Sequence, residues 1–222
     1  MKKFFAILFS VFCLTLLFPA CSSGNNLSGY VSEMRSIIYH GEGQTLSLNA
    51  GYGFKEQPFI NDGKVGKTVN SLTFKLIGKE TDDVTYHLSF NYNDTDYKST
   101  FKLNPITDTV TCSVEIDGFY LNEFTVKISF GANSEEITLK SAIPENTITH
   151  LDALKYLQKN QGALISHYTD DEGNFNAEIY MRILVKDGAP FWYVGIASGN
   201  ENLKALLIDG FSGEILAIRE IF

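Results

Sequence analysis

Apolar and polar residues alternate over much of the first two thirds of the chain. The alternation is cleanest over residues 84–92, where every second residue from Val84 to Tyr92 is apolar and those between are polar. This period of two predicts a β-strand with one buried face. The same pattern recurs over residues 72–76, 110–116 and 124–130, with shorter versions at 46–50, 101–103 and 137–139. About seven strands separated by turn clusters predict an antiparallel β-sandwich of immunoglobulin-like kind over residues 30–143.

The pattern changes around Pro144. Thr149 and Asp152 have the spacing of a capping box, and leucines at 151, 154 and 157 recur at helical spacing. They predict a helix over about residues 150–160 that ends near Gly162. Strands are expected after it at residues 163–168, 177–185, 191–197, 203–208 and 215–218. Residues 144–222 are therefore predicted to form a unit of one helix and an antiparallel sheet, which makes the chain mainly β with an α+β C-terminal unit.

Two groups of aromatic residues are candidate binding positions. Residues 51–69 are the longest stretch without alternation, and Tyr52, Phe54 and Phe59 lie on it. Aromatic side chains on a long loop are common binding anchors, although these rings could also fold back and cap the sandwich. Residues 191–193, the second group, follow one another as Phe191, Trp192 and Tyr193. Successive strand residues face opposite sides, so at least one of these rings points away from the other two.

The N-terminus carries a targeting pattern. Lys2 and Lys3 precede an apolar run over residues 4–18, which is too short to cross a bilayer as a helix. Residues 17–21 (LFPAC) resemble the lipobox of bacterial lipoproteins. The resemblance implies that a signal peptide over residues 1–20 is removed, that Cys21 is lipidated, and that the protein is anchored outside the cytoplasmic membrane. A plain secretory signal cut near Ala20 is the alternative.

Residues 21–29 are rich in Ser, Gly and Asn, a composition that predicts a flexible tether. Removal of the signal and use of Cys21 would leave Cys112 without a disulfide partner among the three cysteines. The formal net charge is −8 and becomes −10 without Lys2 and Lys3. This acidity excludes a nucleic-acid partner, because phosphate binding requires clustered basic side chains.

No catalytic constellation is evident in the sequence. The four histidines lie far apart, and no metal-binding spacing, nucleophile elbow or phosphate-binding glycine loop is present. Cys112 falls on the inward side of its predicted strand, which favours a buried apolar role. Residues 170–174 (DDEGN) invite a calcium interpretation, but an acidic hairpin turn is favoured because the EF-hand spacing is missing. We therefore expect no enzymatic activity, no cofactor and no metal.

The C-terminal unit resembles a PepSY-type domain, a small helix-plus-antiparallel-sheet module of exported bacterial proteins. The resemblance rests on residues 151–162, on the strand pair 178–185 and 192–196, and on residues 207–216 with Asp209 and Gly213. It implies a non-catalytic module proposed to bind or restrain peptidases. Asp209 and Gly213 also fit a turn that has no function of its own.

The sequence therefore predicts a membrane-anchored extracytoplasmic lipoprotein that works by binding. Its partner would be a protein, a peptide or an envelope component. Two alternatives stay open. The C-terminal unit could restrain an envelope peptidase, or the sandwich could serve only as a spacer on the cell surface.

Overall fold

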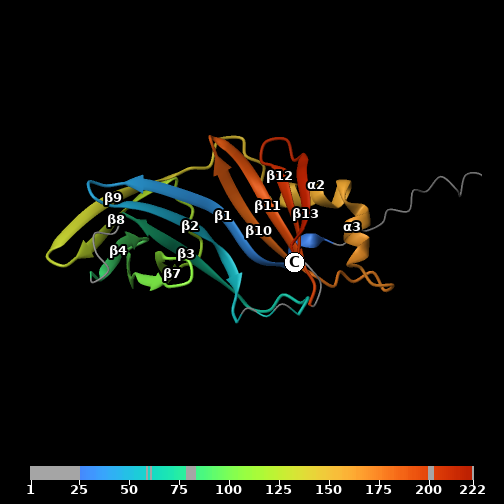
Figure 1. Ribbon diagram of the computed structural model, residues 1–222, viewed down its shortest axis with the longest axis horizontal. Coiled ribbons are helices and arrows are strands. Elements are labelled where there is room, and N and C mark those ends of the chain that lie inside the picture. Colours follow the sequence, from blue (N-terminus) through green and yellow to red (C-terminus); the bar gives the residue numbers. More distant parts are fainter. Residues whose placement is uncertain (1–25, 59, 61, 79–83, 200–202, 222) are drawn as a thin grey trace, which may run out of the picture.

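The protein is mainly β, and the strands of its described part form one hydrogen-bonded sheet (Figure 1). A computed structural model describes residues 26–58, 60, 62–78, 84–199 and 203–221. The signal peptide, Cys21 and Phe59 lie outside the described residues. Nine strands precede the helical region: β1 (Val31–Glu42), β2 (Ser47–Glu56), β3 (Thr68–Ile77), β4 (Tyr86–Tyr92), β5 (Thr95–Thr100), β6 (Lys102–Asn104), β7 (Thr109–Glu115), β8 (Glu123–Phe130) and β9 (Asn133–Ser141).

The helices are η2 (Leu27–Tyr30), a 3₁₀ turn, and the α-helices α2 (His150–Asn160) and α3 (Gly162–His167). Four strands follow them: β10 (Glu178–Lys186), β11 (Ala189–Ala197), β12 (Leu203–Asp209) and β13 (Ile215–Ile221). The main path of the sheet runs β13-β12-β11-β10-β1-β2-β3-β7-β6. The mainly β class predicted from the sequence is confirmed, and the described C-terminal part contains two α-helices where one was predicted.

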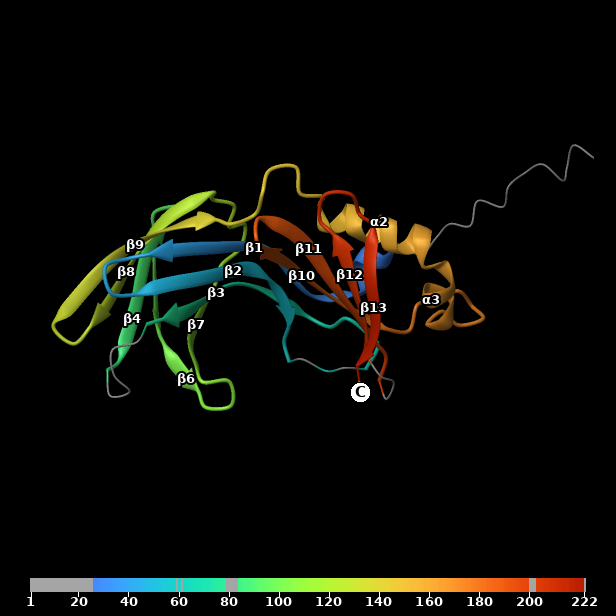
Figure 2. The ribbon, with the colours of Figure 1, turned by 45° about the horizontal axis from the view of Figure 1, so that its top comes forward.

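The first hydrophobic core lies between two layers of strands (Figure 2). One layer is the β1-β2-β3-β7-β6 part of the path, and the other contains β9, β8, β4 and β5. Hydrogen-bonded pairing of β1 with β9, at Tyr39 with Ser141 and His40 with Lys140, joins the layers along one side. The immunoglobulin-like sandwich predicted from the sequence has two separate sheets. Here the two facing layers belong to one continuous sheet.

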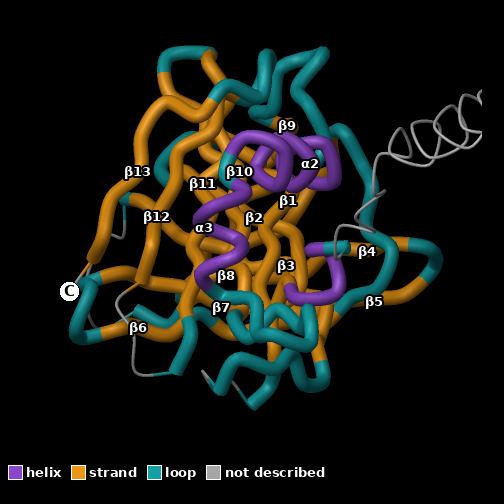
Figure 3. The backbone as a smooth tube through the Cα atoms, turned by 90° about the vertical axis from the view of Figure 1, so that its right-hand side faces the viewer, coloured by secondary structure: helices purple, strands orange, loops and turns teal. Residues whose placement is uncertain are grey.

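The second core lies between the helices and strands β10–β13, as Figure 3 shows from the helical end. Thr149 caps α2 as predicted, because its hydroxyl accepts the backbone N–H of Asp152 at 3.2 Å. Ala153, Leu154 and Leu157 of α2 are buried against the sheet. The strand predicted at residues 163–168 is wrong: these residues belong mostly to α3, whose Leu164 and Ile165 pack against the second core.

Strand β1 belongs to both ends of the sheet. Its first part pairs in parallel with β10, from Val31 opposite Ile179 to Arg35 opposite Arg182. A bulge between Arg35 and Ile37 follows, and the rest of β1 runs beside β2 and β9. Leu27 of η2 is only 1% exposed and is part of the second core. The tether predicted over residues 21–29 therefore overlaps a segment that is packed against the protein.

The strand side chains of both cores lie on the same face of the sheet. Along β2, Tyr52 is buried in the first core, and Phe54, two residues later, packs against the second core. Residues two apart on a regular strand share a face. The neighbouring β3 pairs with all of β2 without a register shift, so β2 does not change faces between these residues. We call the opposite face of β13-β12-β11-β10-β1-β2-β3-β7 the open face.

Candidate functional site

The open face carries a row of charged side chains where β10, β1 and β2 run side by side. Glu33 of β1 is opposite Tyr180 of β10 and Lys55 of β2, and Arg35 is opposite Arg182. These residues alternate with Met34, Ile179 and Met181, which face the second core. The row therefore lies at the centre of the continuous sheet, between its two covered ends.

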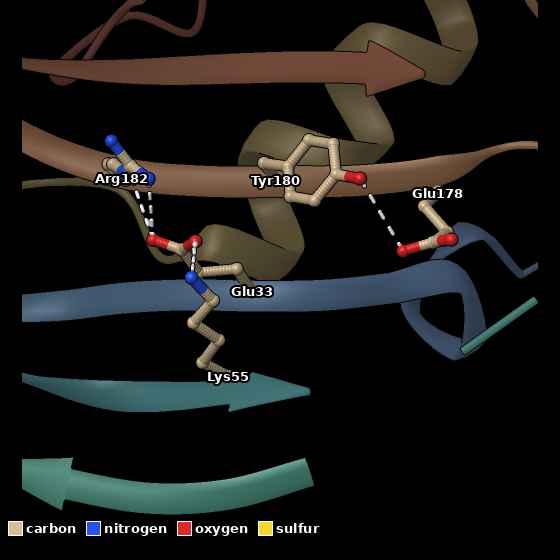
Figure 4. Close-up of polar contacts among 5 residues, drawn as sticks. All are labelled: Glu33, Lys55, Glu178, Tyr180 and Arg182. Atoms are coloured by element: carbon tan, nitrogen blue, oxygen red, sulfur yellow. Dashed lines mark hydrogen bonds and ion pairs between the residues drawn. The ribbon is translucent and has the colours of Figure 1, made fainter. Parts of the chain in front are cut away.

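Glu33 connects three neighbouring strands through ion pairs (Figure 4). Its Oε1 accepts a hydrogen bond from Nε of Arg182 at 2.8 Å and lies 2.8 Å from Nη2 of the same guanidinium, and its Oε2 lies 3.9 Å from Nζ of Lys55. The carboxylate of Glu33 is nearly buried, whereas the two cations are about half exposed. A two-bond contact to a guanidinium is the stronger form of ion pair, so Glu33 fixes the position of β1 between β2 and β10.

A second carboxylate holds the β2–β3 loop onto the start of β10. Glu178 is fully buried, and its Oε1 accepts the backbone N–H groups of Asp62 at 3.1 Å and Gly63 at 3.2 Å. The hydroxyl of Tyr180 donates to Oε2 of Glu178 at 3.5 Å (Figure 4). Burial, with the negative charge of Glu178, raises the pKa of Tyr180 to about 12. This loop consequently covers one border of the open face.

The aromatic run at residues 191–193 divides between the two faces, as strand alternation requires. Trp192 is 3% exposed in the second core, where its Nε1 donates to the carbonyl of Ile148 at 3.0 Å. Phe191 and Tyr193 are half-buried on the open face. Tyr193 lies between Arg182 of β10 and Leu207 of β12, and Phe191 is opposite the exposed Leu184. The open face therefore has an aromatic and aliphatic patch next to the charged row.

The other aromatic group is not on a loop. Strand β2 continues to Glu56, so the loop predicted from residue 51 begins only after that residue. Tyr52 is 5% exposed inside the first core, and Phe54 is half-buried against the second core. These two side chains contribute to packing, and the structure does not bring them together with Phe191 and Tyr193, which lie on the opposite face.

A crevice of about 500 Å³ lies where β10 separates from β1. Its polar wall contains Arg35, His40, Asn49, Thr73, Lys75 and Thr111, and Ile38, Ala142 and Val185 supply apolar contacts. None of the described residues that line it is acidic. None of these residues is a candidate from the sequence alone, because they come from five strands and from the segment after β9. Only the glycines at 51 and 53, which alternate with the aromatic residues of β2, distinguish this region in the sequence.

Two further sequence interpretations are confirmed. Cys112 is buried in the first core, and burial raises the pKa of its thiol to about 12, so the reactive thiolate is disfavoured. Residues 170–174 form a turn in which Asp170 accepts the backbone N–H of Asn174 at 2.7 Å. Within the described part of the chain, no cluster of three or more His, Cys, Asp or Glu could hold a metal ion. None of the helices described is both long and apolar enough to span a bilayer.

Comparisons of the sequence with protein families and with curated proteins find no match, and neither does a comparison of the structure with solved structures.

Proposed function

We propose that this protein is a lipid-anchored extracytoplasmic binding protein without catalytic activity, and that it holds its partner on the open face. The observation that carries the proposal is the patch of Leu184, Phe191, Tyr193 and Leu207. It is only partly covered, whereas the other face of β10, β11 and β12 is buried in the second core. Partly buried aromatic side chains next to charged groups are typical of protein-binding surfaces.

The charges around this patch support an acidic partner. Arg182 is beside Tyr193, and Arg219 of β13 is opposite Ala205 on the same face. Arg35 and Lys55 extend the positive charge across β1 and β2. Glu33 pairs with Arg182 and Lys55, which leaves Arg35 and Arg219 as further positive charges on one face of a protein whose formal net charge is −8. Electrostatic complementarity then favours an acidic protein or peptide segment as the partner.

The proposed anchoring rests on the lipobox-like residues 17–21. The mass of protein purified from its native membrane tests it. The expected mass is that of the chain from Cys21 plus a lipid, and Cys21→Ala should abolish the modification and the membrane association. An unmodified Cys21 in protein released to the medium would overturn the anchoring.

A binding experiment tests the open face. The double variant Phe191→Ser, Tyr193→Ser should lose the envelope protein that co-purifies with the wild type, because it removes both rings without touching either core. Ile106→Ser is the matched control, since Ile106 is 93% exposed in the turn between β6 and β7, far from β11. Equal recovery of the partner by the double variant and the wild type would refute the proposed surface.

A second candidate function concerns the C-terminal unit alone. We propose to interpret the first core as immunoglobulin-like and the unit of α2 and β10–β13 as PepSY-like. The arrangement of one helix before an antiparallel meander, with Asp209 accepting the backbone N–H of Ser212 at 2.7 Å in its last turn, supports the interpretation. This candidate predicts that the full-length protein slows the proteolysis rate of at least one envelope peptidase of its source cell. Unaltered rates for every envelope peptidase would refute it.

A further inference from the structure

The crevice at the junction of the two ends contains a cation, Arg35, that forms no ion pair with a residue of the described part of the chain. Arg35 is half-buried, and its guanidinium forms no hydrogen bond or ion pair with any residue that the structure describes. The charge of Arg182 repels it, and the carboxylate of Glu33, which attracts it, is already bonded to Arg182. Burial and the charge of Arg182 lower the pKa of Arg35. Leaving such a donor unpaired in a hollow is unfavourable, and a bound anion would remove the cost.

The backbone beneath Arg35 is shaped to keep this side chain in the crevice. Gly51 lies under it, and a Cβ atom at this position would come within 2.8 Å of Cδ and 3.2 Å of Nε of Arg35. Any larger residue at position 51 would therefore push the guanidinium out of its place. With glycine at position 51, Arg35 can direct its five N–H donors into the crevice.

The other polar groups of the crevice suit the same ligand. Lys75 of β3 also forms no ion pair with a described residue, and its Cα partner across the sheet is Asn49. His40 is held by Asn49, whose Oδ1 lies 2.7 Å from Nδ1 of the ring, and its Nε2 lies 3.4 Å from Glu42. Thr73 and Thr111 add hydroxyl groups that can donate. A volume of about 500 Å³ fits a small molecule.

We propose that this crevice is a binding site for a small oxyanion, a molecule that carries a carboxylate or phosphate group. Arg35 binds the anionic group with its planar fork, Lys75 contributes a second positive charge, and Ile38 and Val185 contact the apolar part of the molecule. The site goes beyond the acidic partner proposed for the patch at Phe191 and Tyr193. It does not depend on that partner, because neither Phe191 nor Tyr193 lines the crevice.

Calorimetric titration of the full chain with inorganic phosphate and, separately, with succinate tests the site. We expect at least one probe to bind with one-to-one stoichiometry. Tighter binding of phosphate would identify the natural anionic group as a phosphate, and tighter binding of succinate would identify it as a carboxylate. Arg35→Gln and Lys75→Gln should each weaken binding about tenfold or more, the loss expected for a charge-assisted hydrogen bond. Gly51→Ala keeps every charge and should also weaken binding by displacing Arg35.

Circular dichroism verifies that each variant is folded, and Lys75→Gln and Gly51→Ala keep the test decisive if Arg35→Gln does not fold. Lys98→Gln is the matched control, because Lys98 is an exposed lysine of β5 and is absent from the crevice. It should bind like the wild type. The double variant Phe191→Ser, Tyr193→Ser should do so too, which separates this site from the proposed partner surface. Binding of neither probe by the wild type, or equal weakening by Lys98→Gln, would overturn the proposal.

Discussion

The two ends of the sheet bury the same face in different ways. The first core is rich in rings, with Tyr39, Phe74, Phe90, Phe119 and Phe124 in mutual contact between two layers of strands. The second core is largely aliphatic and is closed by helices. Facing β layers lie about 10 Å apart, a gap that large rings fill well. Alternation along the strands therefore decides which face is buried. The segments that pack onto that face, strands at one end and helices at the other, decide the composition of each core.

The largest expected effect comes from removing a ring in the first core. Phe119 is fully buried and touches Tyr39, Tyr52, Tyr92 and Phe124. Phe119→Ala should lower the free energy of unfolding by about 3–5 kcal/mol, because it leaves a cavity among the rings. Urea unfolding followed by the fluorescence of Trp192, which lies at the other end, measures whether the two ends unfold together.

A shared sheet predicts that the Trp192 transition moves by the same amount as the transition seen by circular dichroism. Tyr120→Ala is the control, because Tyr120 is 76% exposed, and it should cost less than about 1 kcal/mol. An unchanged Trp192 transition in Phe119→Ala would mean that the ends are independent.

The next effect concerns the seam between the ends. Glu33→Gln removes the charge that binds Arg182 and Lys55, and we expect it to lower the free energy of unfolding by about 2 kcal/mol. Glu123→Gln breaks an ion pair of similar composition with Lys140 at 3.4 Å, but both side chains are mostly exposed. That change should cost about 0.5 kcal/mol or less. Equal losses in chemical denaturation would show that the seam adds nothing beyond a surface ion pair.

A smaller effect is expected at the helical cover. Thr149→Ala removes the N-cap of α2 and should lower the free energy of unfolding by about 1 kcal/mol. Thr107→Ala, in the exposed turn before β7, is a suitable control in the same denaturation assay. A loss in Thr149→Ala no larger than in this control would argue that packing alone positions α2.

The smallest effect is a dependence on acid that comes from three aspartates at the helical end. Hydrogen bonds lower the pKa of three aspartates there below the ordinary 3.8. Asp152 accepts from the Thr149 hydroxyl and Lys155, and Asp170 accepts from Asn174 and Asn176. Asp209 accepts from the backbone N–H and the hydroxyl of Ser212. Each folded-state pKa is below the unfolded one. Their stabilisation is therefore present above pH 3.8 and is lost as the pH falls through the folded values.

Denaturation midpoints measured from neutral pH down to about pH 2 test this dependence. Asp209→Asn keeps an oxygen that accepts the N–H of Ser212 but cannot titrate, so the variant should lose less stability in acid than the wild type. An identical decline in both would place the acid sensitivity elsewhere.

The sequence predicted the features that depend on neighbouring residues. Alternation located β3, β4, β7 and β8, and the spacing of Thr149 and Asp152 located the start of α2. Strand β2 was missed beyond residue 50 because Gly51 and Gly53 replace the polar residues expected on its open side. Close contacts require these glycines, since a Cβ at position 53 would overlap the carbonyl oxygen of Met34.

Strand β1 was missed for a related reason. The bulge between Arg35 and Ile37 shifts the pattern by one residue, so Met34 and Ile37 both face a core although they differ in parity. Among the candidate site residues, alternation separated Trp192 from Phe191 and Tyr193 correctly. The crevice could not be predicted, because Arg35 and Lys75 become neighbours only through the pairing of β1, β2 and β3.

The parallel pairing of β1 with β10 also sets an order of assembly. Val31 cannot pair with Ile179 until the whole segment between them has been synthesised. The strand-covered end needs only residues up to Ser141, so it can form early, while the beginning of β1 has no partner on the side that later pairs with β10. Contacts so distant in sequence slow folding, because a long loop must be closed before they form. The first strand of the chain thus gains its second neighbour only after β10 has been made, and until then its free edge is open to mispairing.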